Sequence, residues 1–268
     1  ARNGRDGWAA SGPVFGVQLG TQPFEGQERL APVVTTEHEL IVDSGGPGSS
    51  RGGMGVEKGV TLTKAERSVV SYCCDRERSV TWGLWGGLPS IPHGVWVNPG
   101  TQGERYLGSL FSGVPVESGD VLTRPSAGGG GLGDPLERTT EDVCVDVREG
   151  YVSIERAAKD YGVVVREVDA DLAEYEVDEA ATTEMRQFIS ENRHAWLDED
   201  GESVAARYRS KELDKFDLVR QYGVIVDWGS GELLPKTTQQ FRDMLKSRTA
   251  AHWAIPGQVR NEEPTLRV

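Results

Sequence analysis

The stretch "SAGGGGLGDPLER", residues 126–138, contains the residues whose types and spacing could bind phosphate. Its consecutive glycines are Gly128, Gly129, Gly130 and Gly131. Glycine-rich loops can wrap an anion with backbone N–H groups, and nucleotide loops end in Gly-Lys-Ser/Thr for the phosphates and metal. Here Gly133 is followed by Asp134 and Pro135. The match to a nucleotide loop therefore fails at the residues that carry the chemistry.

The residues after the glycines predict the start of a helix. Asp134 suits the N-cap, Pro135 the first helical position and Glu137 the third. Their carboxylates would occupy the positive end of the helix, where a phosphate would otherwise sit. We favour a tight loop that packs closely and starts a helix, over a loop that lines a site with its own N–H groups. A valine at Gly129 is then expected to disturb folding or assembly before it changes nucleotide affinity.

Two further residues could face a site from glycine-rich loops. Asp43 precedes "SGGPG" and Arg51 precedes "GGMG". A turn-forming aspartate and a surface arginine account for them about as well.

The sequence has none of the motifs of a self-contained metal or nucleophile site. Its histidines are His38, His93, His194 and His252, and no two of them have metal-ligand spacing. There is no His-Glu-x-x-His, Cys-x-x-Cys or Gly-x-Ser-x-Gly motif. Cys73, Cys74 and Cys144 give no disulfide framework, so we expect a reduced, cytoplasmic protein and no metal bound by this chain alone.

Composition excludes several classes of partner. The chain has 268 residues, 34 of them glycine, and a net charge of −13, which argues against a nucleic-acid or anionic-membrane surface. No apolar run approaches the roughly 20 residues of a membrane span, and no signal-peptide pattern opens the chain. Because the sequence begins Ala-Arg-Asn-Gly without methionine, we expect a processed chain or part of a longer polypeptide.

The pattern of elements predicts an α+β fold, in which a glycine-rich β region precedes a helical C-terminal part. We divide the chain into a β-rich region, the glycine loop with its helices, and a tail, at residues 1–123, 124–186 and 187–268. Helices are predicted over 135–149, from Ser153 to before Gly162, and from about Asp178. "YGVVV" predicts a short strand between the last two.

The predicted helix after Asp178 has an apolar stripe formed by Ala181, Met185, Phe188 and Ile189, typical of core or partner contact. In the tail, "YGVIVDWGSGELL" predicts a strand, a turn and a strand. "TTQQFRDMLKSR" predicts a helix with Thr237 and Gln240 in capping-box spacing. Its apolar stripe is Phe241, Met244 and Leu245.

Several stretches of the sequence share an order with one known family. They are "DGW", "DSGGPGSSRGGMGVEKGV", "DRERSVTWGLWGG", "SAGGGGLGDPLER", "VREGYVSIERAAKDYGVVV" and "VDEAATTEMR". From about Asp6 to Arg186 the chain resembles the C-terminal part of the hydantoinase B/oxoprolinase family. The patterns "DSGGxGxxRGG" and "GGGGxGDP" are the most specific. The family's aromatic-proline stretch is replaced here by Ser79, Val80 and Thr81.

The resemblance implies that the chain is part of a larger ATP-dependent enzyme. One branch of the family contains ketone carboxylases of the acetone or acetophenone type, which are ligases. The other contains amidohydrolases, which are hydrolases acting on hydantoins, oxoproline or lactams. The resemblance also implies ATP and Mg²⁺ on a partner subunit with an actin-like fold, and a transition metal, Zn or Mn, in the upstream half. The glycine loop is then a family signature rather than the ATP site. Phosphate transfer in both branches makes Arg51, Arg76 and Arg78 candidate donors to phosphate.

The tail after Arg186 favours the ketone carboxylases, because simple hydantoinase B chains tend to finish near that point. A third possibility is a non-catalytic scaffold subunit that completes the pocket of another chain. The sequence leaves the substrate, the stoichiometry and the catalytic residues open.

Overall fold

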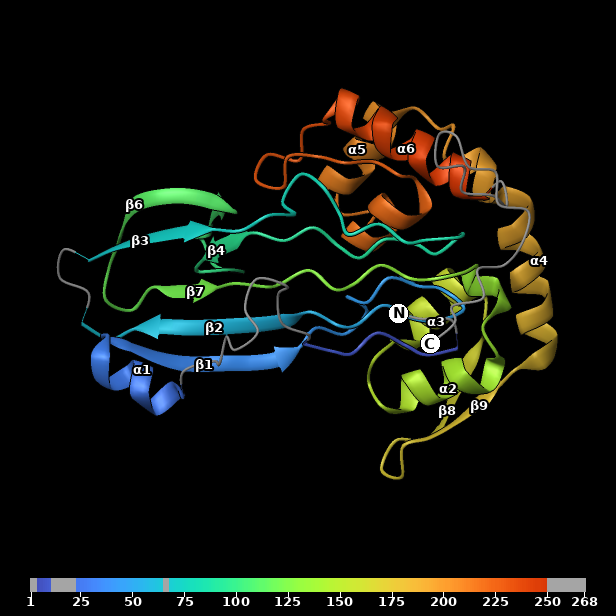
Figure 1. The fold of residues 1–268 in the computed structure, drawn as a ribbon, viewed down its shortest axis with the longest axis horizontal. Coiled ribbons are helices and arrows are strands. Elements are labelled where there is room, and N and C mark those ends of the chain that lie inside the picture. Colours follow the sequence, from blue (N-terminus) through green and yellow to red (C-terminus); the bar gives the residue numbers. More distant parts are fainter. Residues whose placement is uncertain (1–3, 11–22, 65–67, 250–268) are drawn as a thin grey trace, which may run out of the picture.

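The computed structural model describes residues 4–10, 23–64 and 68–249. A β-rich half, at the left of Figure 1, continues into a helical half at the right and top. The main sheet is antiparallel, with strand order β1-β2-β7-β4-β5. In that order its strands are Val33–Leu40, Val56–Leu62, Val121–Thr123, Val95–Val97 and Arg105–Gly108. The strands β3 (Ser68–Cys73) and β6 (Leu110–Val116) form a separate antiparallel ribbon.

One apolar cluster joins the main sheet to the β3–β6 ribbon. Its buried members are Leu62, Val95, Val97, Val116 and Leu122. Helix α1 (Phe24–Leu30) lies beside β1.

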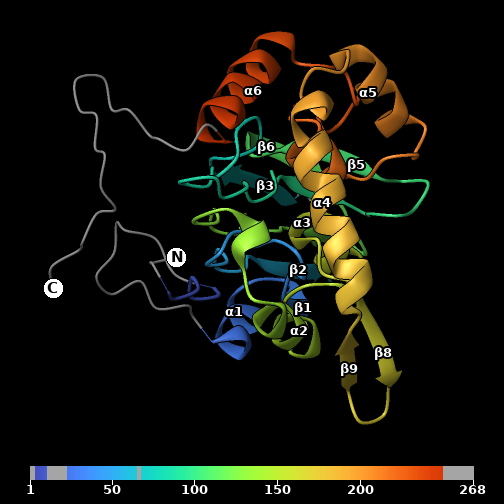
Figure 2. The ribbon, with the colours of Figure 1, turned by 90° about the vertical axis from the view of Figure 1, so that its right-hand side faces the viewer.

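The helical half follows β7 and confirms the predicted α+β fold. Its elements are η1 (Pro135–Glu137), α2 (Thr140–Arg148), α3 (Ile154–Tyr161), β8 (Val165–Asp169), β9 (Glu174–Val177), α4 (Glu179–Trp196), α5 (Gly201–Arg209), the π-helical turn η2 (Asp217–Gln221) and α6 (Pro235–Thr249). Figure 2 shows α4 running from the β8–β9 hairpin to the level of α5. None of the described helices has the length and apolar composition that crossing a bilayer requires.

Local signals place the starts of α3 and α4 correctly. The Ser153 hydroxyl accepts the Arg156 N–H, and the Asp178 carboxylate accepts the Ala181 N–H. Gly162 ends α3 in the left-handed conformation, with φ 64°. The strand predicted at "YGVVV" begins only at Val165, because the residues before it form the turn out of α3.

The single helix predicted over 135–149 is wrong. Asp134 caps only the short η1, where its carboxylate accepts the Leu136 N–H. Arg138 is extended, with φ −66° and ψ 137°. A new helix, α2, then starts behind Thr139, whose hydroxyl accepts the Asp142 N–H. The extended conformation sends the Arg138 side chain into a buried cluster of charges.

The tail packs as part of the core. The predicted hairpin is reduced to one bridge, between Val226 and Leu233, and α6 begins at Pro235, two residues before Thr237. The Val80 side chain from the β3–β4 loop joins a cluster built from the tail. The tail members of that cluster are Leu197, Val219, Ile225, Phe241 and Leu245. In α4, Ile189 is buried but Phe188 is 53% exposed.

Candidate functional site: a glycine-packed layer and its buried charges

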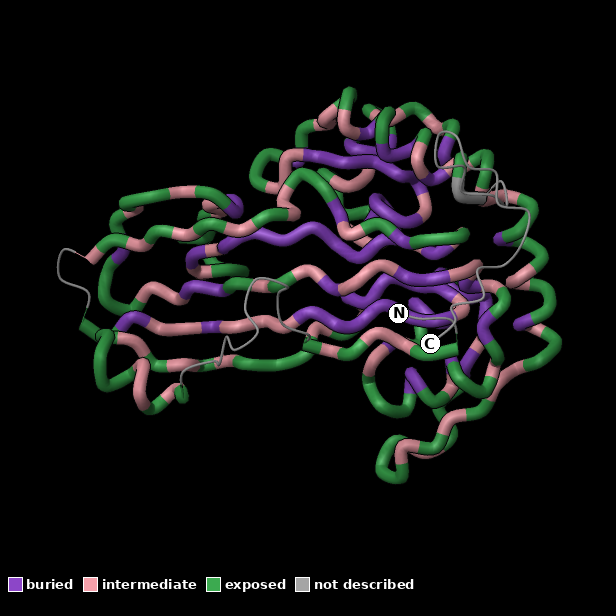
Figure 3. Tube along the Cα trace, viewed as in Figure 1, coloured by how far each residue is buried: buried purple, intermediate pink, exposed green. Residues whose placement is uncertain are grey.

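Glycine-rich segments lie side by side between the sheet and the helices, and we call them the glycine layer (Figure 1). The layer consists of residues 6–8, 43–55, 82–89 and 126–133. Most of its central residues are buried (Figure 3). The N–H of Gly46 donates to Gly129 O at 2.7 Å, and the N–H of Gly129 donates to Gly53 O at 2.8 Å. The N–H of Gly131 donates to Leu88 O at 3.0 Å, so these N–H groups are not available to an anion.

The layer is so thin that most of its glycines leave no space for a side chain. A Cβ on Gly130 would lie 1.9 Å from Trp82 O, and one on Gly131 would lie 1.9 Å from Pro47 O. Gly129 has more room, because its Cβ would lie 3.2 Å from Gly53 N. The glycine run predicted as a candidate phosphate loop therefore packs backbone against backbone.

A first ion cluster, formed by Asp6, Arg51, Arg138 and Asp146, lies against one side of the layer. Arg138 donates to both carboxylate oxygens of Asp6 at 2.8 Å, and its Nη2 is 2.9 Å from Asp146 Oδ2. Arg51 Nε is 3.3 Å from the same Asp146 oxygen, and the Arg51 N–H donates to Asp6. Arg51 also donates to Gly52 O and lies over the Tyr151 ring. Its guanidinium is only 6% exposed and is held by partners within the chain.

The first ion cluster shifts the two carboxyl groups in opposite directions. Burial raises the pKa of Asp146, against the opposing charges of Arg51 and Arg138. Burial alone would raise the pKa of Asp6 as well, but the hydrogen bond and charge of Arg138, with the Arg51 N–H, lower it below the ordinary value.

This shift predicts a pH-dependent contribution of Asp6 to stability. A lowered folded-state pKa means that the contribution is complete above the ordinary value of 3.8 and is lost as the pH falls below it. We expect the difference in unfolding free energy between the native chain and Asp6→Asn to shrink as the pH falls from the ordinary value of 3.8 through the lowered folded-state pKa of Asp6. Urea denaturation at several pH values measures it, and a difference that does not change with pH would contradict the assignment.

A second ion cluster connects the tail to the glycine layer. Arg220 of η2 donates to Asp160 Oδ2 at 2.6 Å. It also donates to the carbonyls of Pro89, Asp43 and Gly45 at 3.1, 2.7 and 3.1 Å. The remaining members of the cluster are Arg156, Lys159, Asp214 and Asp217. One buried guanidinium therefore holds two segments of the layer from a distant part of the chain.

Arg156 of α3 is the other centre of the second ion cluster. Its guanidinium donates to Asp217 at 2.7 Å and to Asp214 at 2.5 Å, while Lys159 donates to Asp217 at 2.9 Å. Burial raises the pKa of Asp160 in spite of Arg220 and Arg156. These contacts hold η2 and α3 against the layer. Lys159, Asp160, Asp217 and Arg220 of the cluster also line a cavity beside Leu88 and Ile189.

The structure brings Asp43, Arg51 and the glycine run together in the layer. Asp43 has a φ of 65°; its N–H donates to Tyr151 O, and its carboxylate accepts the Ser153 N–H at 2.7 Å. Asp43 therefore ties the layer to the start of α3. A left-handed conformation tolerates aspartate better than most residues.

Arg76 and Arg78 lie apart from the layer's ion clusters, on the loop between β3 and β4. Arg76 lies over the Trp82 ring at 5.4 Å and donates to Val80 O at 3.4 Å. The Arg78 side chain is 63% exposed and is 3.4 Å from Asp227. Of the predicted arginines, Arg78 is the one with the most exposed guanidinium.

A cysteine and a histidine meet on the same loop. His93 Nε2 lies 3.6 Å from Cys74 Sγ, and burial lowers the pKa of His93 against the charges of Asp75 and Glu77. A neutral imidazole can accept a thiol proton, but burial disfavours the imidazolium that results. Within the described residues, no three histidine, cysteine or carboxylate side chains come together as a metal site. His252 lies outside those residues.

The protein-family model described as "Hydantoinase B/oxoprolinase" matches residues 1–135, half of the chain. The chain belongs to the hydantoinase B/oxoprolinase family. It is 32% identical over 189 residues to the caprolactamase subunit beta of Pseudomonas jessenii, covering 68% of this chain and 31% of that one.

Two further similarities concern acetone carboxylase. The chain is 27% identical over 242 residues to the alpha subunit from Xanthobacter autotrophicus, covering 76% of this chain and 31% of that subunit. A nucleotide-free acetone carboxylase structure has the same fold, with a TM-score of 0.62 at 23% identity, over 92% of this chain and 36% of that one. The chain spans about a third of the length of the curated relatives it matches.

Sequence reasoning on this member of the hydantoinase B/oxoprolinase family missed the buried charges. Arg138, Asp146, Asp160 and Arg220 are each at most 5% exposed. A signal was present in α2, where Asp146 follows the buried Val143 by three residues and so shares its helix face. A charged residue at a core-facing position needs a buried partner, but its own sequence neighbourhood does not show which.

Proposed function

We propose that this chain is the C-terminal portion, or a split subunit, of an ATP-dependent multi-subunit enzyme that carboxylates a ketone of the acetone or acetophenone class. The observation that carries the proposal is the integration of the tail. Arg220 binds two segments of the glycine layer, and the shared fold with acetone carboxylase extends over 92% of the chain. The alignment to the acetone carboxylase alpha subunit also covers more of this chain than that to the caprolactamase subunit, 76% against 68%.

The alternative reaction is ATP-dependent opening of a cyclic amide. The 32% identity to a caprolactamase subunit supports it, and identity is higher there than to the carboxylase. A non-catalytic scaffold subunit is the third possibility, and the internal position of both ion clusters supports it.

The proposed enzyme places ATP and Mg²⁺ on a partner subunit with an actin-like fold and a transition metal, Zn or Mn, in the upstream half. The described residues of this chain do not fit these groups. The N–H groups of Gly129 and Gly131 donate to carbonyls within the layer. No group of three metal ligands forms in the described part of the chain. We therefore derive no step through ATP or metal on this chain.

The contribution of this chain is to hold a rigid wall and present its loops. A carboxylation through carboxyphosphate or enol phosphate needs a chamber that excludes water, because such intermediates hydrolyse. The glycine layer, with backbones packed directly together, is a wall of that kind. Of the arginines predicted as phosphate donors, Arg78 is then the best placed to bind phosphate or a partner, because its side chain is exposed.

An assay on the complete complex decides between the reactions. It supplies ATP and Mg²⁺ with labelled bicarbonate and a panel of ketones, beside a parallel panel of hydantoins and lactams. We expect ATP-dependent fixation of label into a ketone. Opening of a cyclic amide without fixed label would show the amidohydrolase, and no turnover of either panel would favour the scaffold.

A further inference from the structure

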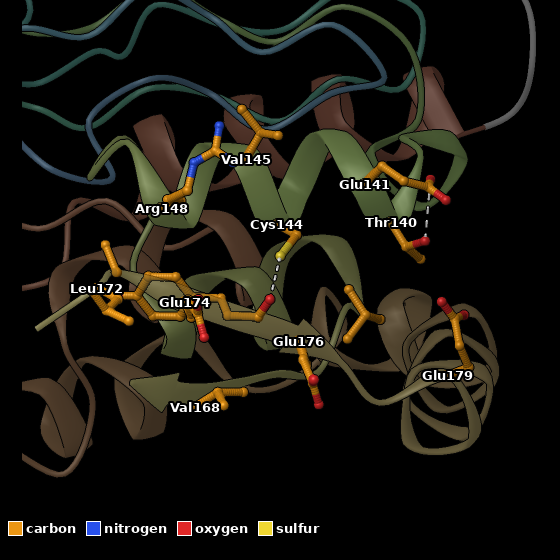
Figure 4. A pocket seen from close by; sticks show the side chains of 13 residues that line it. Thr140, Glu141, Cys144, Val145, Arg148, Val168, Leu172, Glu174, Glu176 and Glu179 are labelled. Atoms are coloured by element: carbon orange, nitrogen blue, oxygen red, sulfur yellow. Dashed lines mark hydrogen bonds between the residues drawn. The ribbon is translucent and has the colours of Figure 1, made fainter. Parts of the chain in front are cut away.

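A groove of about 640 Å³ lies between α2 and the β8–β9 hairpin, away from the glycine layer (Figure 4). From α2 it is lined by Glu141 and Val145, among others. The hairpin supplies Val168, Leu172, Glu174 and Glu176.

The two sides of the groove are fixed to each other. The Cys144 thiol of α2 donates to the carbonyl of Tyr175 in β9, with Sγ 3.6 Å from the oxygen (Figure 4). Tyr175 and Val177 pack on a buried cluster that includes Val143 and Tyr161. The groove is therefore a formed feature of the fold rather than a gap between mobile parts.

The groove is acidic. Glu141, Glu174, Glu176 and Glu179 line it, whereas Arg148 is the one cation of its lining. Arg148 is already paired with Glu149, with Nη2 3.1 Å from Oε1. Arg166 stands directly opposite Glu176 across the hairpin, but it already pairs with Asp178 at 3.6 Å. The negative charges of the groove therefore outnumber the cations near them.

Aliphatic side chains are exposed in the same groove. Val145, Val168 and Leu172 are 42, 55 and 67% exposed. A surface that combines apolar side chains with a one-signed charge is typical of a binding site for a complementary partner.

We propose that this groove binds a polypeptide segment of another subunit that carries Lys or Arg side chains together with aliphatic ones. Its cations would pair with the glutamates, and its aliphatic side chains would cover Val145, Val168 and Leu172. A second copy of this chain fits poorly, because each copy has a net charge of −13. That the partner is another subunit rests on the proposed multi-subunit enzyme. The acidic and aliphatic character of the groove does not depend on that proposal.

The test uses the purified chain and three labelled synthetic peptides, followed by fluorescence anisotropy. One peptide contains lysine, leucine and alanine; in the second, glutamate replaces lysine; in the third, serine replaces leucine. We expect the first to bind, and both others to bind at least about tenfold more weakly. Equal binding of the first and third peptides would show that only the net charge of the peptide matters, and would overturn the proposal.

Matched variants locate the binding on the chain. Glu174→Gln with Glu176→Gln is expected to weaken the lysine–leucine peptide about fivefold, and Leu172→Ser by a similar factor. The control, Glu39→Gln with Glu184→Gln, removes the same charge from exposed positions outside the groove and should change affinity less than about twofold. Equal effects of the two charge pairs, or no binding of the first peptide, would overturn the groove as the site. Carboxylase activity is not used, so failure here is distinct from failure of the proposed reaction.

Discussion

Replacement of Gly131 by alanine is expected to prevent the chain from folding stably. The new Cβ would lie 1.9 Å from the Pro47 carbonyl oxygen and 2.4 Å from its carbon. A backbone carbonyl cannot rotate away as a side chain can, so the layer itself would have to separate. We expect a loss of at least about 3 kcal/mol, the upper end of ordinary overpacking costs. Thermal unfolding and the yield of soluble protein measure it.

Gly129→Ala is the matched control, one residue outside the tight pair Gly130 and Gly131. Its Cβ would meet Gly53 N at 3.2 Å, a contact that a shift of a few tenths of an ångström relieves. We expect a cost of about 1 kcal/mol. If Gly131→Ala were as stable as Gly129→Ala, the close packing of the layer would be wrong. If it folded normally but abolished ATP binding by the assembled enzyme, the phosphate-loop interpretation would return.

Replacement of Arg220 by methionine is expected to destabilise the chain by about 3 to 5 kcal/mol, because it leaves Asp160 buried without its closest cation. Three backbone carbonyls of the glycine layer also lose their donor. Against a typical total stability of about 5 to 15 kcal/mol, this is a large fraction. Chemical denaturation with two probes, one on the tail and one on the layer, measures it.

Two further variants separate the buried pair from a general effect of removing arginine. Arg105→Met breaks a long ion pair in which the arginine is 48% exposed, with Nη2 3.8 Å from Asp120, and should cost less than about 1 kcal/mol. Combining Arg220→Met with Asp160→Leu removes the stranded charge, so we expect the double variant to recover part of the lost stability. A double variant that is the sum of the two single losses would show that the pair is not coupled.

These two predictions concern the parts of the molecule that join distant segments of sequence. If both hold, removal of the tail should loosen the glycine layer, because the tail supplies Arg220. The tail would then fold together with the glycine layer instead of forming a separate unit.

The sequence by itself determined the features that depend on near neighbours. The fold class followed from the order of strand and helix patterns. The starts of α3 and α4 followed from Ser153 and Asp178, and the end of α3 from Gly162, because a cap involves residues within one turn. The family also followed from the sequence, because its motifs are contiguous.

The tertiary structure decided what the motif residues do. Asp134 and Pro135 satisfied the local rule for a helix start, but the helix broke at Arg138. The reason lies far away, since the Arg138 guanidinium is bound by Asp6, 132 positions earlier in the chain. A local pattern cannot contain that partner.

The same limit applies to the candidate site. Arg51 was a predicted phosphate donor, and the structure places its guanidinium in a buried ion cluster with Asp146. The glycine run showed that close approach was needed, but not that Trp82 and Pro47 are what it approaches. Packing against backbone from another part of the chain is a property of the folded layer. The sequence shows which residue types are present, whereas the tertiary structure decides which distant residues they contact.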